Sequence, residues 1–181
     1  DDANIAVDST VDGGYTFAVN AGTGTVTMGG ALGGSTAINS FAATGNTISL
    51  EGNITTADVA SNDVTFTGAT ELTSGITIDT NQTTNDGDIS FSSTLNSESG
   101  ETNSLVLDAD SGSVTFSSTV GATDRLSTLA VTGATTLTGN VSTSSTQDFN
   151  SAVTLAANTT LDADDANIAV DSTVDGGYTF A

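Results

Sequence analysis

Apolar residues along this chain recur as pairs that are separated by one polar residue. A spacing of two places both apolar side chains on one face of a β-strand, while Thr, Ser or Asp faces the other way. The pairs that define the predicted strands are Ile5/Val7, Phe17/Val19, Val26/Met28, Ile48/Leu50, Val64/Phe66, Ile76/Ile78, Ile89/Phe91, Leu105/Leu107, Val114/Phe116, Leu129/Val131 and Val153/Leu155.

Turn signals separate these short strands. They are Asp12-Gly13-Gly14, Gly33-Gly34, Thr44-Gly45-Asn46, Asn85-Asp86-Gly87 and Ser111-Gly112. Gly and Asn tolerate the positive φ that a tight corner requires. No stretch of ten residues carries apolar side chains at i, i+3, i+4 and i+7, so the pattern predicts an all-β chain with essentially no helix.

Strands with only two apolar side chains bury little surface unless they stack. In a solenoid each coil covers the apolar face of the coil before it, and one narrow core follows the axis. We therefore predict a parallel β-helix with coils of about 20–25 residues. The expected coil starts in register are Ile5, Val26, Ile48, Ile89, Val114 and Leu137, with one extra coil that uses Val64/Phe66 and Ile76/Ile78.

Two other all-β architectures compete with this prediction. Tandem immunoglobulin-like sandwiches are the runner-up, although that fold usually needs about 100 residues and longer strands. A closed antiparallel barrel has no reason to repeat head to tail.

The chain repeats itself exactly over a long distance. Its first 18 residues, DDANIAVDSTVDGGYTFA, recur letter for letter as residues 164–181, at an offset of 163. Residues 1–163 are therefore interpreted as one full period, and residues 164–181 as the start of the next. Such repetition is typical of an array and not of a single enzyme domain.

A weaker repeat divides the period. Residues 15–47 align without gaps on residues 103–135, at an offset of 88, and the identical positions include Gly33 with Gly121 and Gly45 with Gly133. The alignment predicts two divergent sub-repeats, approximately residues 64–152 and residues 153–163 continuing into 1–63. The larger one carries an insertion near Asp79 to Asp86.

Composition narrows the range of functions. The chain has 22 Asp and Glu, one Lys or Arg, no His, no Cys and no Pro, and a formal net charge of -21. Abundant Thr and Val with no Pro argue against disorder. Without His or Cys there is no imidazole base, thiol nucleophile or zinc site, and without a basic patch we expect no nucleic-acid partner. No apolar run approaches the ~18 residues of a spanning helix, so we expect no membrane insertion of this segment.

Catalysis is disfavoured by the same residues. A lyase on this fold usually needs a cationic base or charge neutraliser, and only Arg125 is available. Its aligned partner in the weaker repeat is Ala37, so it is not a repeated feature. An outward-pointing side chain, or a salt bridge from Arg125 to Asp124 or to a neighbouring coil, is the simpler interpretation. We expect no enzyme and no required cofactor.

Two segments resemble a known group of proteins. NAGTGTVTMGGALGGSTAINSFAATG, residues 20–45, and DADSGSVTFSSTVGATDRLSTLAVTGATTLTGN, residues 108–140, resemble the β-strand repeats of giant bacterial surface proteins of the filamentous-haemagglutinin type. The resemblance covers essentially the whole chain, but its motif is a loose alternation of Thr and Val with Gly corners. It implies a long β-helical adhesin or filament at the bacterial cell surface, which associates with itself along or between filaments or binds a cell-surface or matrix ligand.

Acidic clusters are the candidate metal sites. Asp162, Asp164 and Asp165 lie at the period junction, where Asp164 and Asp165 repeat Asp1 and Asp2. Two further pairs at expected corners are Asp86 with Asp88 and Asp108 with Asp110. Calcium takes six to eight oxygen ligands from carboxylates and turn carbonyls. None of the clusters has the spacing of an EF-hand or a calcium-bound nonapeptide, so the residues predict at most a weak Ca²⁺ site.

The charge also has a collective consequence. Removing the four Asp of the duplicated segment leaves 18 acidic residues and one Arg per period. Spread along a rod of about 35–40 Å, this density approaches that of duplex DNA. We therefore expect an extracellular, non-catalytic filament or adhesive stalk that attracts counterions. The alternative from another class is a Ca²⁺-dependent binding module for a carbohydrate or matrix ligand.

Overall fold

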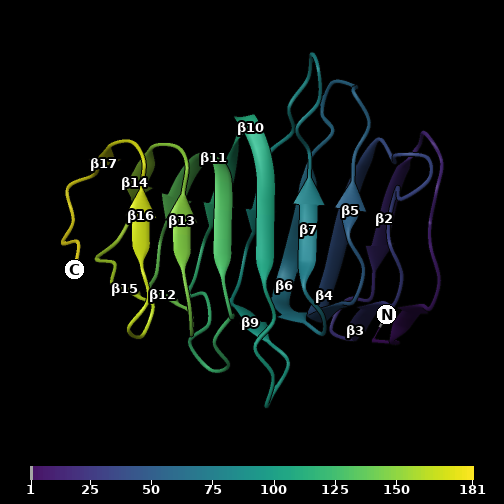
Figure 1. Cartoon of the computed structure of the whole chain (residues 1–181). Coiled ribbons are helices and arrows are strands. Elements are labelled where there is room, and N and C mark those ends of the chain that lie inside the picture. Colours follow the sequence, from purple (N-terminus) through teal and green to yellow (C-terminus); the bar gives the residue numbers. More distant parts are fainter. Residues whose placement is uncertain (1) are drawn as a thin grey trace.

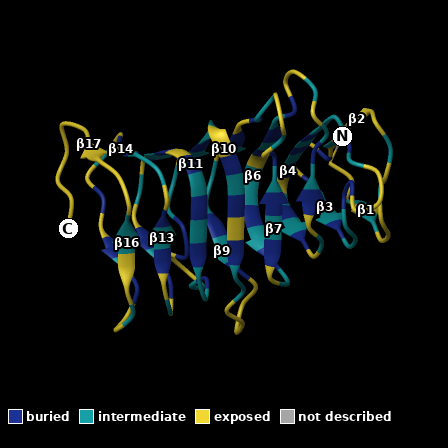
Figure 2. Ribbon diagram, turned by 45° about the horizontal axis from the view of Figure 1, so that its top comes forward, coloured by how far each residue is buried: buried dark blue, intermediate teal, exposed yellow. Residues whose placement is uncertain are grey.

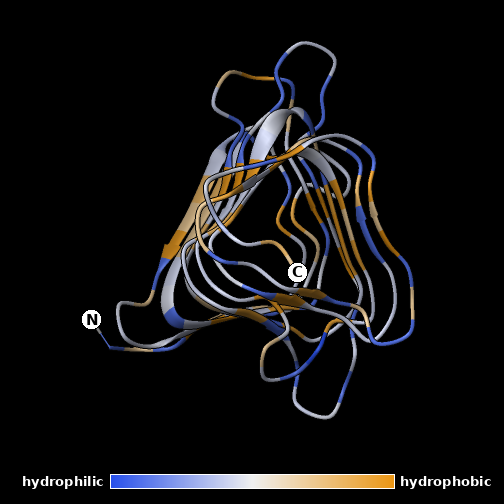
Figure 3. Ribbon diagram, turned by 90° about the vertical axis from the view of Figure 1, so that its left-hand side faces the viewer, coloured by the Kyte–Doolittle hydropathy of each residue, from blue (hydrophilic) through white to orange (hydrophobic). Residues whose placement is uncertain are grey.

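The protein is an all-β solenoid in which the chain winds in stacked triangular coils. The computed structural model describes residues 2–181, and Asp1 lies outside the described residues. These residues form seventeen strands and no helix, and every strand pairing is parallel. The coils progress along one axis from the N-terminal to the C-terminal end (Figure 1), and three sides enclose the interior when the rod is viewed along that axis (Figure 3).

The strands form three faces, which we name I, II and III in the order in which the chain first visits them. Face I holds β1 (Ile5–Val7), β3 (Thr25–Met28), the second halves of β4 (Ser40–Leu50) and β6 (Val64–Leu72), β9 (Leu95–Ser97), β12 (Val141–Ser142) and β15 (Leu161–Asp162). Face II holds β5 (Ile54–Thr55), β7 (Ile76–Asp79), the first parts of β10 (Leu105–Phe116) and β11 (Leu129–Leu137), β13 (Gln147–Phe149) and β16 (Ile168–Val170). Face III holds β2 (Thr16–Asn20), the first halves of β4 and β6, β8 (Ile89–Phe91), the second parts of β10 and β11, β14 (Val153–Leu155) and β17 (Val174–Asp175).

The alternating sequence explains how each strand contributes to the core. In β11, for example, Leu129, Val131 and Leu137 are fully buried, while Ala130, Thr132, Ala134 and Thr136 alternate with buried positions and are more exposed. Successive coils place their apolar side chains at positions that pair in register on each face. The buried residues therefore form one continuous core along the axis (Figure 2). This arrangement confirms the predicted parallel β-helix. It excludes sandwiches and closed barrels built from antiparallel strands.

Five phenylalanines form an aromatic ladder behind face III. Ring centroids are 5.9 Å apart between Phe17 and Phe41 and between Phe41 and Phe66. They are 4.8 Å apart between Phe66 and Phe91 and 5.5 Å apart between Phe91 and Phe116. These distances lie in the favourable range for stacked or edge-on aromatic pairs, so the ladder ties five successive coils together.

The four long strands turn a corner without ending. The pairing register shifts between Thr44 and Thr47 in β4, and again between Asp108 and Ser113 in β10. A bulge of this kind bends a strand. As a result β4 and β6 pass from face III to face I, whereas β10 and β11 pass from face II to face III.

The expected coil spacing is right but the expected register is only partly right. Ile5, Val26 and Ile48 share face I as predicted. Ile89 and Val114 instead pair on face III, and Leu137 pairs with Phe116 on that face, so these three do not continue the first ladder. The pattern of apolar pairs is the same on all three faces, and it therefore does not show which face a pair occupies. The extra coil between Ile48 and Ile89 is present, with Val64/Phe66 on face III and Ile76/Ile78 on face II.

Glycines at equivalent corners of the weaker repeat have the same role. Gly33 has φ 74° and Gly121 has φ 67°. A Cβ on Gly33 would lie 2.2 Å from the carbonyl oxygen of Thr55, and one on Gly121 would lie 2.0 Å from that of Ser142. Both positions therefore require glycine for two reasons: the φ angle is positive, and the backbone of the next coil leaves no room for a Cβ. The predicted insertion, Asp79 to Asp86, falls at the corner between β7 and β8.

Candidate functional site

Several acidic side chains lie at corners, where they accept hydrogen bonds from a neighbouring coil. Asp12 shows the arrangement: its Oδ1 accepts from the backbone N–H of Ser35 at 2.8 Å and from that of Thr36 at 3.0 Å. These two bonds hold the pKa of Asp12 below its ordinary value. Such side-chain bonds connect successive coils at the corners, where the strand pairing is interrupted.

Asp86 and Asp88 occupy the corner before β8 and both contact the next coil. The Asp86 carboxylate accepts from the Ser111 hydroxyl and, at 2.8 Å, from the backbone N–H of Gln82. The Ser111 hydroxyl, followed by the Gln82 N–H, lowers the pKa of Asp86. Oδ1 of Asp88 accepts from both the backbone N–H and the hydroxyl of Ser113, each at 2.8 Å.

Asp108 and Asp110 flank the bend in β10. Oδ1 of Asp108 accepts from the side-chain amide of Asn81 at 3.2 Å, and Asp110 adopts a positive φ of 40°. Asp108 pairs in register with Asp79 of the preceding coil. Desolvation raises the pKa of Asp79, the negative charge of Asp108 adds to the rise, and the backbone N–H of Asn81 opposes it. This is an electrostatically unfavourable position in the coil stack.

Arg125 joins three successive coils at the period junction. Its Nη1 donates to the carbonyl oxygen of Thr143, one coil further on, at 2.9 Å. Its Nη2 forms a 2.5 Å ion pair with Asp162 on the coil after that, and Nη1 lies 3.4 Å from Asp164. The hydrogen bond from Arg125 lowers the pKa of Asp162. The predicted salt bridge to a neighbouring coil is confirmed, and we call this group the Arg125 clip (Arg125, Thr143, Asp162 and Asp164).

The structure does not gather the candidate metal ligands into one site. Asp86, Asp88 and Asp108 accept hydrogen bonds at their own corners, Asp110 lies in the bend of β10, and Asp162 and Asp164 face Arg125. Asp165 follows in the turn that leads to β16. Within residues 2–181, no group of three or more acidic side chains is placed to hold a metal ion. The weak Ca²⁺ site stays a prediction.

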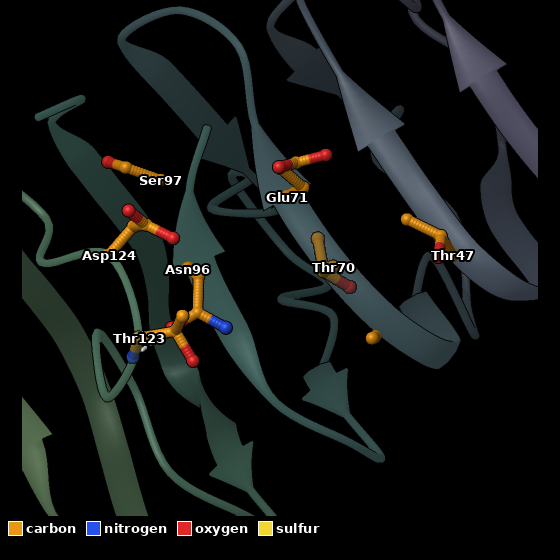
Figure 4. A pocket seen from close by; sticks show the side chains of 8 residues that line it. Thr47, Thr70, Glu71, Asn96, Ser97, Thr123 and Asp124 are labelled. Atoms are coloured by element: carbon orange, nitrogen blue, oxygen red, sulfur yellow. Dashed lines mark hydrogen bonds between the residues drawn. The ribbon is translucent and has the colours of Figure 1, made fainter. Parts of the chain in front are cut away.

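A shallow hollow of about 280 Å³ lies on face I (Figure 4). Its labelled side chains come from β4, β6, β9 and the corner before Leu126, and they include Glu71, Asn96, Thr123 and Asp124. The backbone N–H of Thr123 donates to Oδ1 of Asn96 at 3.1 Å, which fixes that wall. Hydroxyl, amide and carboxylate groups can bond a neutral polar molecule or a cation, and the two acids repel an anion.

Asparagines at the corners are the inter-coil contacts that the sequence analysis missed. Their side-chain Oδ1 atoms accept from a backbone N–H of the next coil at 2.9–3.0 Å. The pairs are Asn4 to Thr25, Asn53 to Thr77, Asn140 to Thr160 and Asn158 to Thr179. The signal was present as an Asn that precedes a Thr by one coil length. It carries information only once the coil length at that point is known.

Comparison with known proteins gives no relative. No family model matches the chain, and neither the curated proteins nor the solved structures contain a match. Across residues 2–181 the structure has no helix long and apolar enough to cross a bilayer.

Proposed function

We propose that this chain is a segment of an extracellular structural filament or adhesive stalk whose function comes from length, stiffness and repetition. The observation that carries the proposal is the uninterrupted parallel stack. The backbone of each coil bonds to the next on all three faces, and corner side chains continue the bonding between strands. A solenoid of this kind grows in length without growing in width, since each coil contacts only its neighbours.

The chemistry of the surface supports a mechanical role. The chain has no His, Cys or Lys, and its one Arg is held in the Arg125 clip. Several acidic residues, among them Asp12 and Asp88, hydrogen bond to the coil stack, which gives these side chains a structural use without a reaction. High negative charge keeps such rods apart in solution and soluble at high local concentration.

Immunogold labelling of intact source cells tests the proposal. Antibodies raised against the folded chain are expected to decorate filaments or a coat outside the cell, in electron micrographs of unpermeabilised cells. Contour length should increase by about 35 Å for each 163-residue period, since coils are spaced by about 4.8 Å. Labelling that requires permeabilisation and stays inside the cell contradicts the proposal.

A further inference from the structure

The 18-residue segment that occurs twice lies on different faces at its two positions. In the first copy, Ile5 pairs with Val26 on face I. In the second copy the equivalent residue, Ile168, pairs with Gln147 on face II. The other equivalent residues shift in the same direction, from face II to face III for Val11 and Val174, and from face III to the edge of face I for Phe17 and Phe180.

The shift follows from the number of coils in a period. The face I ladder that begins at Ile5 takes seven steps to Leu161, and Ile168 then lies one face further along the winding direction. The intermediate members of the ladder are Val26, Ile48, Thr70, Leu95, Val120 and Val141. The offset of 163 residues therefore corresponds to seven and a third coils.

The weaker repeat shows the same behaviour inside the chain. Phe41 of β4 lies on face III, and its equivalent at the offset of 88, Leu129 of β11, lies on face II. Both strands are bent at equivalent glycines, Gly45 and Gly133, yet β4 bends from face III to face I and β11 from face II to face III. This offset corresponds to three and two-thirds coils, so equivalent sequence folds equally well on different faces.

The second copy leaves apolar side chains uncovered. Ile168, Val174 and Phe180 are 41%, 37% and 45% exposed. In the first copy, the equivalent side chains are covered by the next coil. There Ile5 pairs with Val26, Val11 with Leu32 and Phe17 with Phe41.

Two hydrogen-bond acceptors of the first copy, which the next coil satisfies, also have equivalents in the second copy. In the first copy, Asp12 accepts from the backbone of Ser35 and Thr36. Asn4 accepts from Thr25 N–H at 2.9 Å. The equivalents in the second copy are Asp175 and Asn167. A coil with the sequence of residues 19–41 would supply the donors for both and an apolar partner for each exposed side chain.

We propose that residues 164–181 form a junction between consecutive periods. A coil with the sequence of residues 19–41, from a following period on the same chain, covers them, and each period is rotated by a third of a turn relative to the last. Three periods, or 22 coils, then restore the original orientation after about 106 Å. This inference concerns the winding of the rod, and it does not require the extracellular role proposed above.

The rotation determines what the filament presents to its surroundings. A feature that occurs once per period, such as the exposed Tyr15 or the hollow beside Glu71, points in three directions along the rod. The rod therefore has no single binding face. Neighbouring rods or ligands can contact it from every side, which favours three-dimensional bundles over flat ribbons.

Hydrogen exchange tests the covering coil. The full chain is extended after Ala181 by a second copy of residues 19–41, and exchange is followed over residues 168–181 by mass spectrometry. Backbone N–H groups of Val174 and Gly176 should gain acceptors, as those of Val11 and Gly13 have in the carbonyls of Ala31 and Thr36. Exchange there should slow by at least about tenfold. The matched control carries Val26→Asp and Leu32→Asp in the added copy only, and it should lose the protection.

Two outcomes of that experiment contradict the proposal. Exchange equal to that of the unextended chain would show that the added sequence does not cover the junction. Protection that appears in the unextended chain and depends on protein concentration would assign the surface to a second molecule.

Fibre diffraction tests the rotation. Aligned fibres of a chain with six tandem periods should give a 4.8 Å meridional reflection from the strand spacing. A threefold screw predicts layer lines that index on about 106 Å, with the first meridional intensity near 35 Å. Layer lines that index on 35 Å alone would mean unrotated periods and would overturn the proposal. A pattern with the 4.8 Å reflection but no longer axial order would mean that the stack breaks at each junction, which overturns it as well.

Discussion

Side-chain oxygens at the corners act across coils, and their effect depends on what each one meets there. Asp12 and Asp86 accept hydrogen bonds that favour the charged carboxylate and lower its pKa. Asp79 is desolvated and lies next to Asp108, and both effects disfavour the charged form of its carboxylate. Acidic residues that look alike in the sequence therefore stabilise the fold at some corners and strain it at others.

Removing the charge should have opposite effects at Asp86 and Asp79. Asp86→Asn weakens the bond from the Ser111 hydroxyl, so it should lower the Tm at pH 7 by about 1–3 °C. Asp79→Asn keeps an oxygen to accept from Asn81 and removes the repulsion from Asp108, so it should raise the Tm. Circular dichroism melts of the two variants provide the measurement. A fall in Tm for both would mean that repulsion at Asp79 is unimportant.

The sign of the pH dependence follows from the pKa directions. The lowered pKa of Asp86 means that its stabilisation is present above 3.8, its ordinary value, and is lost as the pH falls through the lower folded value. The raised pKa of Asp79 means the reverse: the fold gains from its protonation at low pH and loses that gain as the pH rises through the folded value. Both variants should converge on the parent chain in strong acid.

The Arg125 clip should stabilise the C-terminal coils. Arg125→Gln removes the ion pairs to Asp162 and Asp164, and should lower the Tm by about 1–3 °C at pH 7 and 10 mM salt. The loss should shrink at 1 M salt, where the Debye length falls to about 3 Å. It should also shrink as the pH falls below 3.8 and Asp162 becomes protonated.

Asp124→Asn is the control for the clip, because it removes a neighbouring charge without touching the ion pairs. Equal destabilisation by Asp124→Asn and Arg125→Gln, with no dependence on salt, would contradict this role of Arg125.

Sequence reasoning found the acidic residues but not their partners. Clustering along the chain identifies Asp86, Asp108 and Asp162 as candidates, whereas their contacts lie 25, 27 and 37 residues away. Those separations depend on how many residues each corner uses. Residue type and spacing therefore predicted where charge gathers, and the coil register was needed to show what each charge contacts.

At the scale of the strand, the apolar pairs spaced by two were sufficient to predict the fold. A pair such as Val114 and Phe116 identifies a strand with one buried face, and the tandem repeat indicates stacking. The pairs do not identify the face, and the sequence therefore places Ile89 and Val114 on the wrong ladder. Face assignment depends on corner geometry, including the bends within β4 and β10 that no turn signal distinguishes from a strand end.

The aromatic ladder should be most sensitive at its centre. Phe91 stacks on Phe66 and Phe116 and is fully buried, so Phe91→Ala should cost about 3–5 kcal/mol of unfolding free energy. Phe17 has one ring neighbour, Phe41, and is only half-buried, so Phe17→Ala should cost less, about 1–2 kcal/mol. Urea denaturation compares the two. Equal costs would mean that the ladder does not act as a cooperative stack.

At the scale of the whole molecule, negative charge is spread over all sides of a thin rod. Its linear density of about one charge per 2 Å approaches that of duplex DNA, so divalent cations should bridge rods side by side. Light scattering should rise on millimolar CaCl₂ and stay low in NaCl of equal ionic strength, and EDTA should reverse the rise. Scattering that does not change across a calcium titration would contradict this prediction.

The Arg125 clip should also affect the resistance of such a rod to proteolysis. Trypsin-like proteases cleave after Lys or Arg, and this sequence offers one such bond, after Arg125. The guanidinium that a protease would have to draw into its specificity pocket is already held by Asp162, Asp164 and the carbonyl of Thr143. Cleavage therefore requires local opening of three coils at once. An array of such periods should resist proteases that cleave after basic residues, although it is rich in loops.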